Sequence, residues 1–329
     1  MPTQPTGQPR TIVITGGTGG LGYGCATAIL SAPDGPWHVV LPSRDVGRGK
    51  EAVGKLAARA AAGNTVEAMP MDLASLASVR EFAAELTSRL KPGGLPPLYG
   101  LVCNAGVQAG TTLTKTADGF ESTFGVNHLG HFLLVNELLP VLQPPARLVV
   151  VASGVHDPAQ KARVPVPAWN NAHALARGEL GPSAASDRPF TAGQRRYSTS
   201  KLANMYFTYS LARRLPDGVT VNAYDPGMIL GTGLQREAAP PLRFVANRIM
   251  PLMKPLLHRV LTPYIYTAEE SGAMLARLVT SPDLNGVTGK YFGAGRREAI
   301  HSSDESYDTA RAEELWQDSL ALTGASSIR

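Results

Sequence analysis

The chain contains little cysteine: Cys25 and Cys103 are the only two in 329 residues. Both stand in apolar segments that we expect to be buried, so the sequence predicts no disulfide framework and favours a reducing compartment, the cytoplasm. Because no stretch of about 18 uninterrupted apolar residues occurs, we expect no membrane-spanning helix. The polar, proline-rich start MPTQPTGQPR also lacks the apolar core of a signal peptide.

The chain also has only a small excess of charge of one sign. The 31 lysine and arginine residues exceed the 26 acidic residues only slightly, and they form no long basic run. This pattern argues against nucleic acid as a partner and suits a small-molecule substrate with an anionic cofactor. The hydrophobic share of 43% is enough for a full core.

What the chain does have is an alternation of strand and helix patterns. Short apolar runs predict strands at residues 11–15, 37–42, 65–69, 100–106, 147–153, 219–224 and 289–292. Helical patterns follow at residues 20–30, 75–90, 118–142, 195–215 and 269–279. A further helix, rich in alanine, follows the second strand and extends to about residue 62. This order indicates a doubly wound α/β fold, the Rossmann fold, with about seven parallel strands and helices on both faces. We expect residues 1–329 to form one domain that ends in a helix at residues 305–322.

A glycine-rich loop, TGGTGGLG, lies between the first expected strand and the first expected helix. Glycine permits a tight turn and the close approach of a pyrophosphate, and the following helix N-terminus offers free N–H groups. The glycine spacing is wider than G-x-G-x-x-G, but its place at the first strand–helix junction favours dinucleotide binding over an ordinary turn. The expected cofactor contacts in this loop are Gly16, Thr18, Gly20, Leu21 and Gly22.

The second expected strand ends in Ser43, Arg44 and Asp45, and Arg48 follows one helical turn later. An acidic residue at this point suits the ribose hydroxyls of NAD, whereas a basic residue accommodates the 2′-phosphate of NADP. Because Arg44 stands at the strand end and Arg48 can close over the same phosphate, the sequence favours NADP(H) over NAD(H). Asp45 is then the start of a helix. The alternative is that the two arginines are solvated surface charges.

Tyr197 and Lys201 are four residues apart, on one face of an expected helix. A tyrosine normally loses its proton near pH ~10, and a lysine charge beside it lowers that pKa. A tyrosine tuned in this way can give or take a hydroxyl proton. The pair alone is weak evidence, since this spacing also arises by chance.

Four motifs in order carry a resemblance to a known family. The wide glycine loop, Asn104-Ala105-Gly106 after the fourth strand, Ser153 after the fifth and Tyr197-x-x-x-Lys201 resemble the short-chain dehydrogenase/reductase superfamily over residues 11–292. The stretches VNHLGHFLL (126–134) and YSTSKLAN (197–204) are similar to its branch of retinol dehydrogenases and light-dependent protochlorophyllide reductases. The arginine at the strand end also fits that branch, which mostly uses NADPH.

The resemblance implies a role for each catalytic residue. Tyr197 would be the proton donor or acceptor at the substrate oxygen, and Lys201 would lower its pKa. Tyr197 and Lys201 would both contact the cofactor, Lys201 at the nicotinamide ribose. Ser153 would hydrogen-bond the substrate carbonyl and stabilise its developing charge. Asn127 would hold a water that links Lys201 to solvent. Hydride would pass between the nicotinamide and the carbonyl carbon, and no metal is needed.

The resemblance also implies the remaining cofactor contacts. Asp72, with Leu73 after it, would hold the adenine, and the residues after the fourth strand would line the adenine ribose. The segment after the sixth strand would cover the nicotinamide. The contacts implied at these last two places are Asn104, Ala105, Gly106, Pro226, Gly227, Ile229 and Thr232.

The sequence departs from the family pattern at three points. Ala152 replaces the first of two serines, and Asp225 stands where histidine or asparagine often precedes Pro-Gly. The light-driven reductases carry a functional cysteine near the catalytic tyrosine, whereas this chain has none after Tyr197. A C=C reductase resembling protochlorophyllide reductase stays an alternative, as does a non-catalytic dinucleotide-sensing or scaffold protein on the same fold.

Other candidate residues have plainer interpretations. His128 and His131 have a spacing that a metal could use, but no third ligand follows, so helix packing is the better interpretation and no metal site is predicted. Cys103 stands in mid-strand and is expected in the core. His156 either contacts substrate or lies on a surface loop, and the sequence favours neither.

Two segments are expected to set the substrate. Residues 155–194 form a long insertion before the catalytic helix, and residues 228–266 contain an apolar stretch at 242–261. We interpret the second segment as a lid over a bulky, apolar carbonyl or alcohol substrate. The alternatives are an amphipathic helix that makes peripheral membrane contact and a subunit interface. Related enzymes often pair through long helices, so a homodimer stays open.

Overall fold

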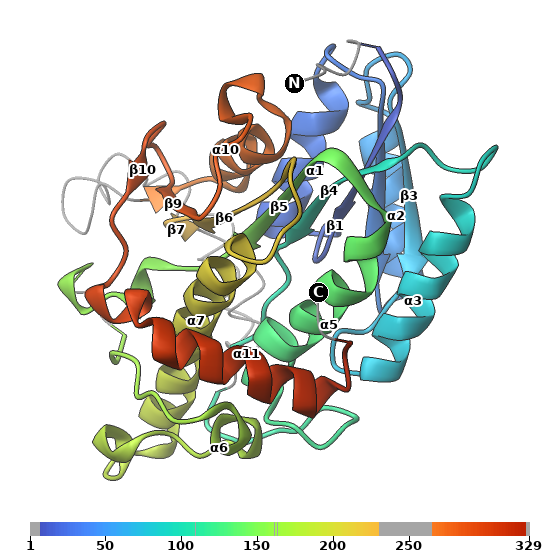
Figure 1. Ribbon diagram of the computed structural model, residues 1–329. Coiled ribbons are helices and arrows are strands. Elements are labelled where there is room, and N and C mark those ends of the chain that lie inside the picture. The colour runs from blue at the N-terminus through green and yellow to red at the C-terminus, as the bar shows by residue number, and fades with distance from the viewer. Residues whose placement is uncertain (1–6, 109, 161, 163, 230–264, 327–329) are drawn as a thin grey trace, which may run out of the picture.

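The computed structural model describes residues 7–108, 110–160, 162, 164–229 and 265–326 (Figure 1). Its centre is an eight-stranded sheet in the order β10-β9-β6-β5-β4-β1-β2-β3. All neighbouring strands are parallel except β10, which is antiparallel to β9. The strands are β1 (Arg10–Ile14), β2 (Trp37–Ser43), β3 (Thr65–Pro70), β4 (Leu98–Cys103), β5 (Leu142–Val151), β6 (Val219–Asp225), β9 (Lys290–Gly293) and β10 (Ala299–Ile300).

This sheet confirms the doubly wound fold, and β1 to β6 follow the order 3-2-1-4-5-6. The chain reverses its direction of travel between β1 and β4, and ligands bind at such a switch point, beyond the carboxyl ends of the strands. The glycine loop follows β1 and Asn104 follows β4, so both lie at this crevice. Three short strands escaped the sequence pattern: β10, and the separate pair β7 (Met228–Ile229) with β8 (Ile265–Tyr266).

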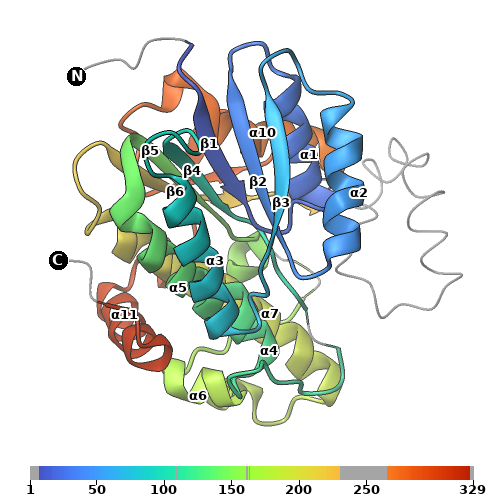
Figure 2. The same ribbon diagram turned by 90° about the vertical axis from the view of Figure 1, so that its right-hand side faces the viewer.

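Helices cover both faces of the sheet (Figure 2). One apolar cluster joins one face to α1 (Gly20–Ser31), α2 (Val46–Ala57) and α10 (Ala268–Thr280). A second joins the other face to α3 (Leu76–Arg89), α5 (Gly130–Leu138) and α7 (Pro189–Ala212). Because β1, β4, β5 and β6 are buried on both sides, they read as nearly continuous apolar runs.

The expected long helix at residues 118–142 is helical only over residues 122–141, and it is not a regular α-helix. It consists of α4 (Ser122–Phe124), a π-helical turn η1 (Gly125–Leu129), α5 and a 3₁₀ turn η2 (Leu139–Val141). The side chain of Glu121 caps the start by accepting the N–H groups of Thr123 and Phe124 over 2.9 and 2.7 Å. A π turn inserts one residue into a helix and is frequent at functional sites.

The catalytic helix begins earlier than expected. Pro189 starts α7, six residues before the predicted start at 195, and proline is favourable in a first turn. The inserted segment before it contains a short helix, α6 (Ala172–Arg177). Ser198 Oγ donates to the Pro165 carbonyl over 2.7 Å, and Thr199 Oγ1 accepts the Ala168 N–H over 3.0 Å. One side of α7 thus holds the insertion in place.

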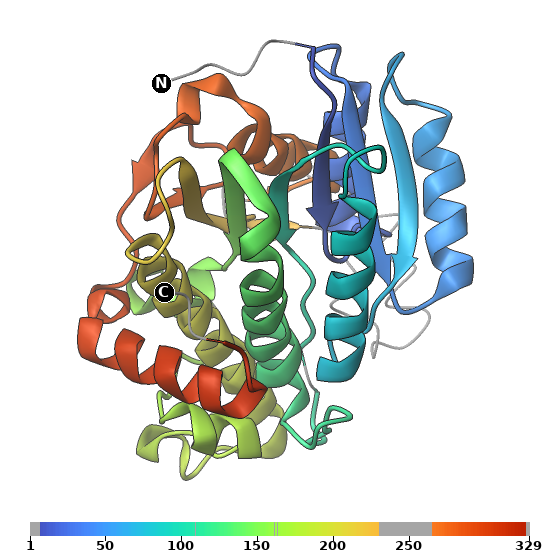
Figure 3. The same ribbon diagram turned by 45° about the vertical axis from the view of Figure 1, so that its right-hand side comes forward.

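The C-terminal helix α11 (Thr309–Thr323) begins later than the predicted residue 305, after a 3₁₀ turn η9 (Asp304–Tyr307). Its Trp316 is 2% exposed and stacks on Phe207 of α7 with ring centres 6.1 Å apart. The Ser210 hydroxyl of α7 donates to the Ala312 carbonyl over 3.1 Å. Figure 3 shows α11 lying against the outside of the helical layer. Part of the outer surface of α7 is therefore buried within a single chain.

Within the described ranges, no helix has the length and apolarity needed to cross a bilayer. The apolar stretch 242–261 and Thr232 lie outside the described residues.

Candidate active site

The glycine loop after β1 can be built only from glycine at several positions. Gly16 and Gly20 have φ of +66° and +53°, in the left-handed region. A Cβ on Gly22 would lie 2.6 Å from the Gly16 carbonyl oxygen and 2.5 Å from Asn104 Nδ2. No side chain caps the start of α1 at Gly19, so the first N–H groups of this helix are available to an anion.

Asn104 and Ala105, both predicted, hold the loop in place through Thr15, which the prediction omitted. Their backbone N–H groups each donate to Thr15 Oγ1 over 2.9 Å. Asn104 Nδ2 also donates to the Thr15 carbonyl over 2.7 Å. The amide of Asn104 thus fixes the conformation of the glycine loop, a role that its place after β4 does not reveal.

His131 completes this network from α5. Its Nδ1 lies 3.2 Å from the Asn127 carbonyl, which can only accept, so Nδ1 carries the proton and Nε2 accepts from Thr15 Oγ1 over 2.9 Å. Burial lowers the pKa of His131 to about 4 and keeps the ring neutral at ordinary pH. The sequence offered no signal for this contact, because Thr15 and His131 are 116 residues apart.

At the end of β2, the acidic residue has a local task. Asp45 is the N-cap of α2, and its Oδ1 accepts the N–H of Arg48 over 3.0 Å. The Ser43 hydroxyl donates to the Asp45 carbonyl over 2.8 Å. Arg44 is exposed, and the Arg48 guanidinium reaches back to within 3.9 Å of where a Cβ on Gly19 would stand. The expectation that Asp45 begins a helix is confirmed.

Tyr197, Lys201 and Asn204 lie on the side of α7 that faces the sheet. Lys201 Nζ and Asn204 Nδ2 both donate to the Val151 carbonyl at the end of β5, over 3.0 and 3.1 Å. Lys201 is 3% exposed, and its Nζ lies 5.5 Å from the centre of the Tyr197 ring. The end of β5 therefore fixes where the Tyr–Lys pair lies relative to the sheet.

The protonation of this pair differs from the sequence-based expectation. Burial raises the pKa of Tyr197, the Asp225 carboxylate raises it further, and a hydrogen bond with Ser153 acts in the opposite direction. Burial lowers the pKa of Lys201 to about 8, and Asp225 opposes that change. Lys201 donates to the Val151 carbonyl, and the phenol is stabilised in its protonated form.

Asn127 lies in the π turn, close to Lys201. Its Oδ1 accepts the Val107 N–H over 2.8 Å, and its Nδ2 donates to the Val107 carbonyl and to Ser200 Oγ over 2.9 and 3.0 Å. A Cβ on Gly106 would stand 3.4 Å from Asn127 Oδ1 and 3.8 Å from Lys201 Nζ. The structure thus brings two of the predicted catalytic residues to the same point beside Gly106.

Two more predicted cofactor segments border the crevice. Gly227 has φ +67°, and its N–H donates to Asp225 Oδ1 over 3.0 Å. Ser271 Oγ donates to the Pro226 carbonyl over 3.0 Å, and Ile229 belongs to β7. After β3, Asp72 Oδ1 accepts the Ala74 N–H over 3.0 Å, and Leu73 is buried next to it.

The other histidines and Cys103 have structural surroundings. His128 donates or accepts at Ser319 Oγ over 2.8 Å and packs among phenylalanines, away from the Thr15 partner of His131. Burial lowers the pKa of His128 to about 3. Burial also raises the pKa of Cys103 to about 12, which makes its thiol unreactive. The described residues contain no group of three side chains arranged to hold a metal.

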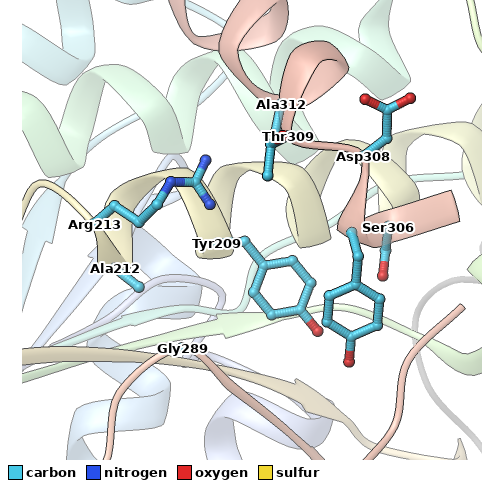
Figure 4. A pocket seen from close by; sticks show the side chains of 9 residues that line it. Tyr209, Ala212, Arg213, Gly289, Ser306, Asp308, Thr309 and Ala312 are labelled. Atoms are coloured by element: carbon cyan, nitrogen blue, oxygen red, sulfur yellow. The ribbon is translucent and has the colours of Figure 1, made fainter. Parts of the chain in front are cut away.

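A cavity of about 280 Å³ lies away from this site, at the carboxyl end of α7 (Figure 4). The stacked rings of Tyr209 and Tyr307, with centres 5.0 Å apart, line it. Tyr209 is three helical turns beyond Tyr197, a distance of roughly 18 Å along the axis. The cavity is therefore separate from the Tyr–Lys pair.

The sequence model of the short chain dehydrogenase family matches residues 10–164. Retinol dehydrogenase 14 from Mus musculus is 36% identical over 327 residues, which cover 96% of this chain and 86% of that protein. The chain belongs to the short-chain dehydrogenase family. Protochlorophyllide reductase from Avena sativa is also 36% identical, over 95% of this chain and 99% of its own length. The predicted resemblance is confirmed, and this short-chain dehydrogenase is a member of a family of oxidoreductases.

Solved structures share the fold of this short-chain dehydrogenase. An uncharacterized protein from Mycobacterium paratuberculosis matches with a TM-score of 0.63 and 28% identity, over 96% of this chain and 94% of that one. A short chain dehydrogenase from Burkholderia cenocepacia in complex with NADP matches with a TM-score of 0.60 and 22% identity, over 88% and 97%. The second likeness supports the fold alone.

Proposed function

We propose that this short-chain dehydrogenase interconverts a carbonyl and an alcohol on a bulky apolar substrate, with NADP(H) as its cofactor and Tyr197 as the acid/base. One observation carries the proposal: Asn127 of η1, Ser153 after β5, and Tyr197 and Lys201 of α7 come together from three parts of the fold. Lys201 lies over the Tyr197 ring, Ser153 is within hydrogen-bonding reach of the phenol, and Asn127 shares the space beside Gly106 with Lys201.

Each residue then has a defined task. The bound nicotinamide supplies or accepts the hydride. The Tyr197 hydroxyl, kept protonated by burial and by Asp225, donates its proton to the substrate oxygen during reduction. Ser153 Oγ stabilises negative charge on the same oxygen. Lys201, anchored by the Val151 carbonyl, keeps a positive charge close to the phenol and offsets the charge that Tyr197 acquires.

The cofactor preference rests on the residues at the end of β2. Asp45 is occupied as the N-cap of α2, so it does not compete for the ribose hydroxyls. Arg44 is exposed at the strand end, and the Arg48 guanidinium lies close to Gly19 at the start of α1. A 2′-phosphate placed here would receive charge-assisted hydrogen bonds from both guanidinium groups.

Residues 1–329 act as one domain in this proposal, and the lid at 228–266 stays a prediction.

Thermal unfolding with added cofactor tests this preference. We expect NADPH to raise the melting temperature more than NADH at equal concentration. Arg44→Ala and Arg48→Ala should each weaken NADPH binding by about 10- to 100-fold, since a hydrogen bond to a charged group contributes roughly 1.5–3 kcal/mol. Arg59→Ala, an exposed arginine just beyond α2, is the matched control and should bind NADPH like the wild type. Equal stabilisation by both cofactors would contradict the phosphate site.

The reaction itself is tested with a panel of ketones and aldehydes and NADPH, measured as loss of NADPH absorbance in the dark. We expect turnover with bulky apolar carbonyl compounds and little with small polar ones of the same reactivity. Turnover of none of them, while NADPH still binds, would favour the non-catalytic alternative and would refute the proposal.

A second candidate is reduction of a C=C bond. It is favoured by the similarity to protochlorophyllide reductases, which is as high as that to retinol dehydrogenase 14. The absence of cysteine after Tyr197 argues against a light-driven version of it. A protochlorophyllide arm of the panel, run in light and in darkness, separates the two. Reduction of that pigment with no reduction of any carbonyl would establish the second candidate.

A further inference from the structure

His156 lies three residues after the proposed catalytic serine and is completely buried. Its burial contradicts the expected position on a surface loop. Its Nδ1 lies 2.6 Å from the Ser153 carbonyl oxygen, and its Nε2 lies 3.4 Å from the backbone N–H nitrogen of Ser303. The ring also meets Tyr291 of β9 edge-on, with centres 5.3 Å apart.

These contacts fix the tautomer of the ring. A carbonyl oxygen can only accept and a backbone N–H can only donate, so Nδ1 carries the proton and Nε2 is bare. Both hydrogen bonds therefore require the neutral imidazole. Burial lowers the pKa of His156 and favours that form, although the carboxylates of Asp225 and Asp157 act in the opposite direction.

The turn that follows Ser153 forms hydrogen bonds to both the carbonyl oxygen and the Oγ of the serine. The backbone N–H of His156 donates to the Ser153 carbonyl over 3.1 Å, alongside the Nδ1 bond to the same oxygen. Ser153 Oγ accepts the Val155 N–H over 3.5 Å, a weak contact that leaves the hydroxyl able to reach Tyr197. The orientation of the Ser153 hydroxyl therefore depends on a turn whose strongest bond comes from His156.

A polar cluster near the C-terminal end braces His156. The Ser302 hydroxyl is 2.7 Å from Tyr209 Oη on α7 and 2.6 Å from Ser306 Oγ. Ser306 Oγ donates to the Ser303 carbonyl over 2.6 Å, next to the N–H that His156 accepts. Figure 1 shows this segment, between β10 and α11, passing beside α7. The imidazole thus bridges the catalytic turn and a rigid part of the C-terminal segment.

We propose that His156 is a positioning residue that orients the Ser153 hydroxyl by holding the Ser153 carbonyl through its Nδ1–H. This inference rests on the proposed function, because it needs Ser153 to act on the substrate oxygen. Asparagine places a side-chain N–H where Nδ1 stands, whereas glutamine places its polar atoms where Nε2 stands. His156→Asn therefore keeps the bond to Ser153 and loses Ser303, and His156→Gln does the reverse.

The two variants give the test, with carbonyl reduction and thermal unfolding as separate measurements. Each loses one hydrogen bond, and we expect the larger decrease in melting temperature in H156Q, which loses the shorter of the two bonds. We expect kcat to stay near the wild-type value in H156N and to fall about tenfold or more in H156Q, since a small misplacement of a reacting group is costly. The KM for NADPH should be unchanged in both variants.

A double-mutant cycle shows whether the effect passes through the serine. In a Ser153→Ala background, H156Q should cause no further loss of kcat, because the hydroxyl that it misplaces is gone. Equal losses of kcat from H156Q in both backgrounds, or equal losses from H156N and H156Q, would overturn this inference alone. A wild-type enzyme that reduces no carbonyl compound would overturn the proposed function, and this inference with it.

Discussion

Replacing Tyr197 by phenylalanine is expected to lower kcat for carbonyl reduction by about 10²- to 10⁴-fold, the range typical of a lost general acid. The substitution removes the Tyr197 hydroxyl, and with it the proton that the phenol donates, and leaves the ring in place. Because burial and Asp225 keep Tyr197 protonated, the wild-type hydroxyl is ready to donate at neutral pH. The measurement is kcat and KM with NADPH and the best carbonyl substrate of the panel.

Tyr206→Phe is the matched control for this experiment. Tyr206 lies on the same helix but packs edge-on against Trp169, with ring centres 4.8 Å apart, on the side held by α6. It should keep the wild-type rate. NADPH binding should also be unchanged in Tyr197→Phe, since the hydroxyl does not hold the glycine loop. A Tyr197→Phe enzyme that reduces the substrate at nearly the wild-type rate would show that the proton comes from another group.

Acid is expected to destabilise the protein steeply below pH 6.5, the ordinary pKa of histidine. In the unfolded chain, His128 and His131 take up protons near that pH, whereas in the folded chain their pKa values are about 3 and about 4. The unfolded state therefore binds more protons, and the free energy of unfolding falls as the pH falls. Each group contributes about 1.4 kcal/mol per pH unit, so the pair removes roughly 7 kcal/mol between pH 6.5 and 4.

That loss is comparable with the whole stability of a typical protein, roughly 5–15 kcal/mol. Denaturant unfolding at about pH 7, 6 and 5 measures how the free energy of unfolding falls as the pH falls. His128→Phe, which suits the aromatic surroundings of this residue, should make the slope shallower by about half. His301→Gln, at an exposed histidine, should leave the slope as it is. A free energy of unfolding that is flat between pH 7 and 5 would contradict buried, neutral rings.

The fold and the order of the site residues could be predicted because they depend on local pattern. Strands such as β5 and β6 are buried on both faces, so they read as apolar runs, and the loop at Gly16–Gly22 is glycine because backbone atoms fill the space of a Cβ. These signals are written in consecutive residues. The spacing of Tyr197 and Lys201 is a signal of this kind, whereas Asn127 and Ser153 were predicted from the resemblance to the family.

What the pattern could not provide depends on contacts between distant residues. The residues of the π turn and of α5 are buried nearly all round, so no one-sided apolar stripe reveals the extra residue, and the sequence predicted a regular helix. Thr15 meets His131 across 116 residues, and His156 meets Ser303 across 147. The direction of the pKa change at Tyr197 also escaped prediction, because the spacing to Lys201 shows a neighbouring charge but not the depth of burial.

The packing of α11 on α7 has a consequence for how the enzyme is made. The partner of Ser210 on α11 lies 102 residues further along the chain. At a synthesis rate of about 5–20 residues per second, α7 therefore waits roughly 5–20 s for the helix that covers Phe207. During that interval the outer flank of the helix that bears Tyr197 presents an aromatic surface to the cell. Until Trp316 has been synthesised, Phe207 lacks the ring that stacks on it in the folded chain.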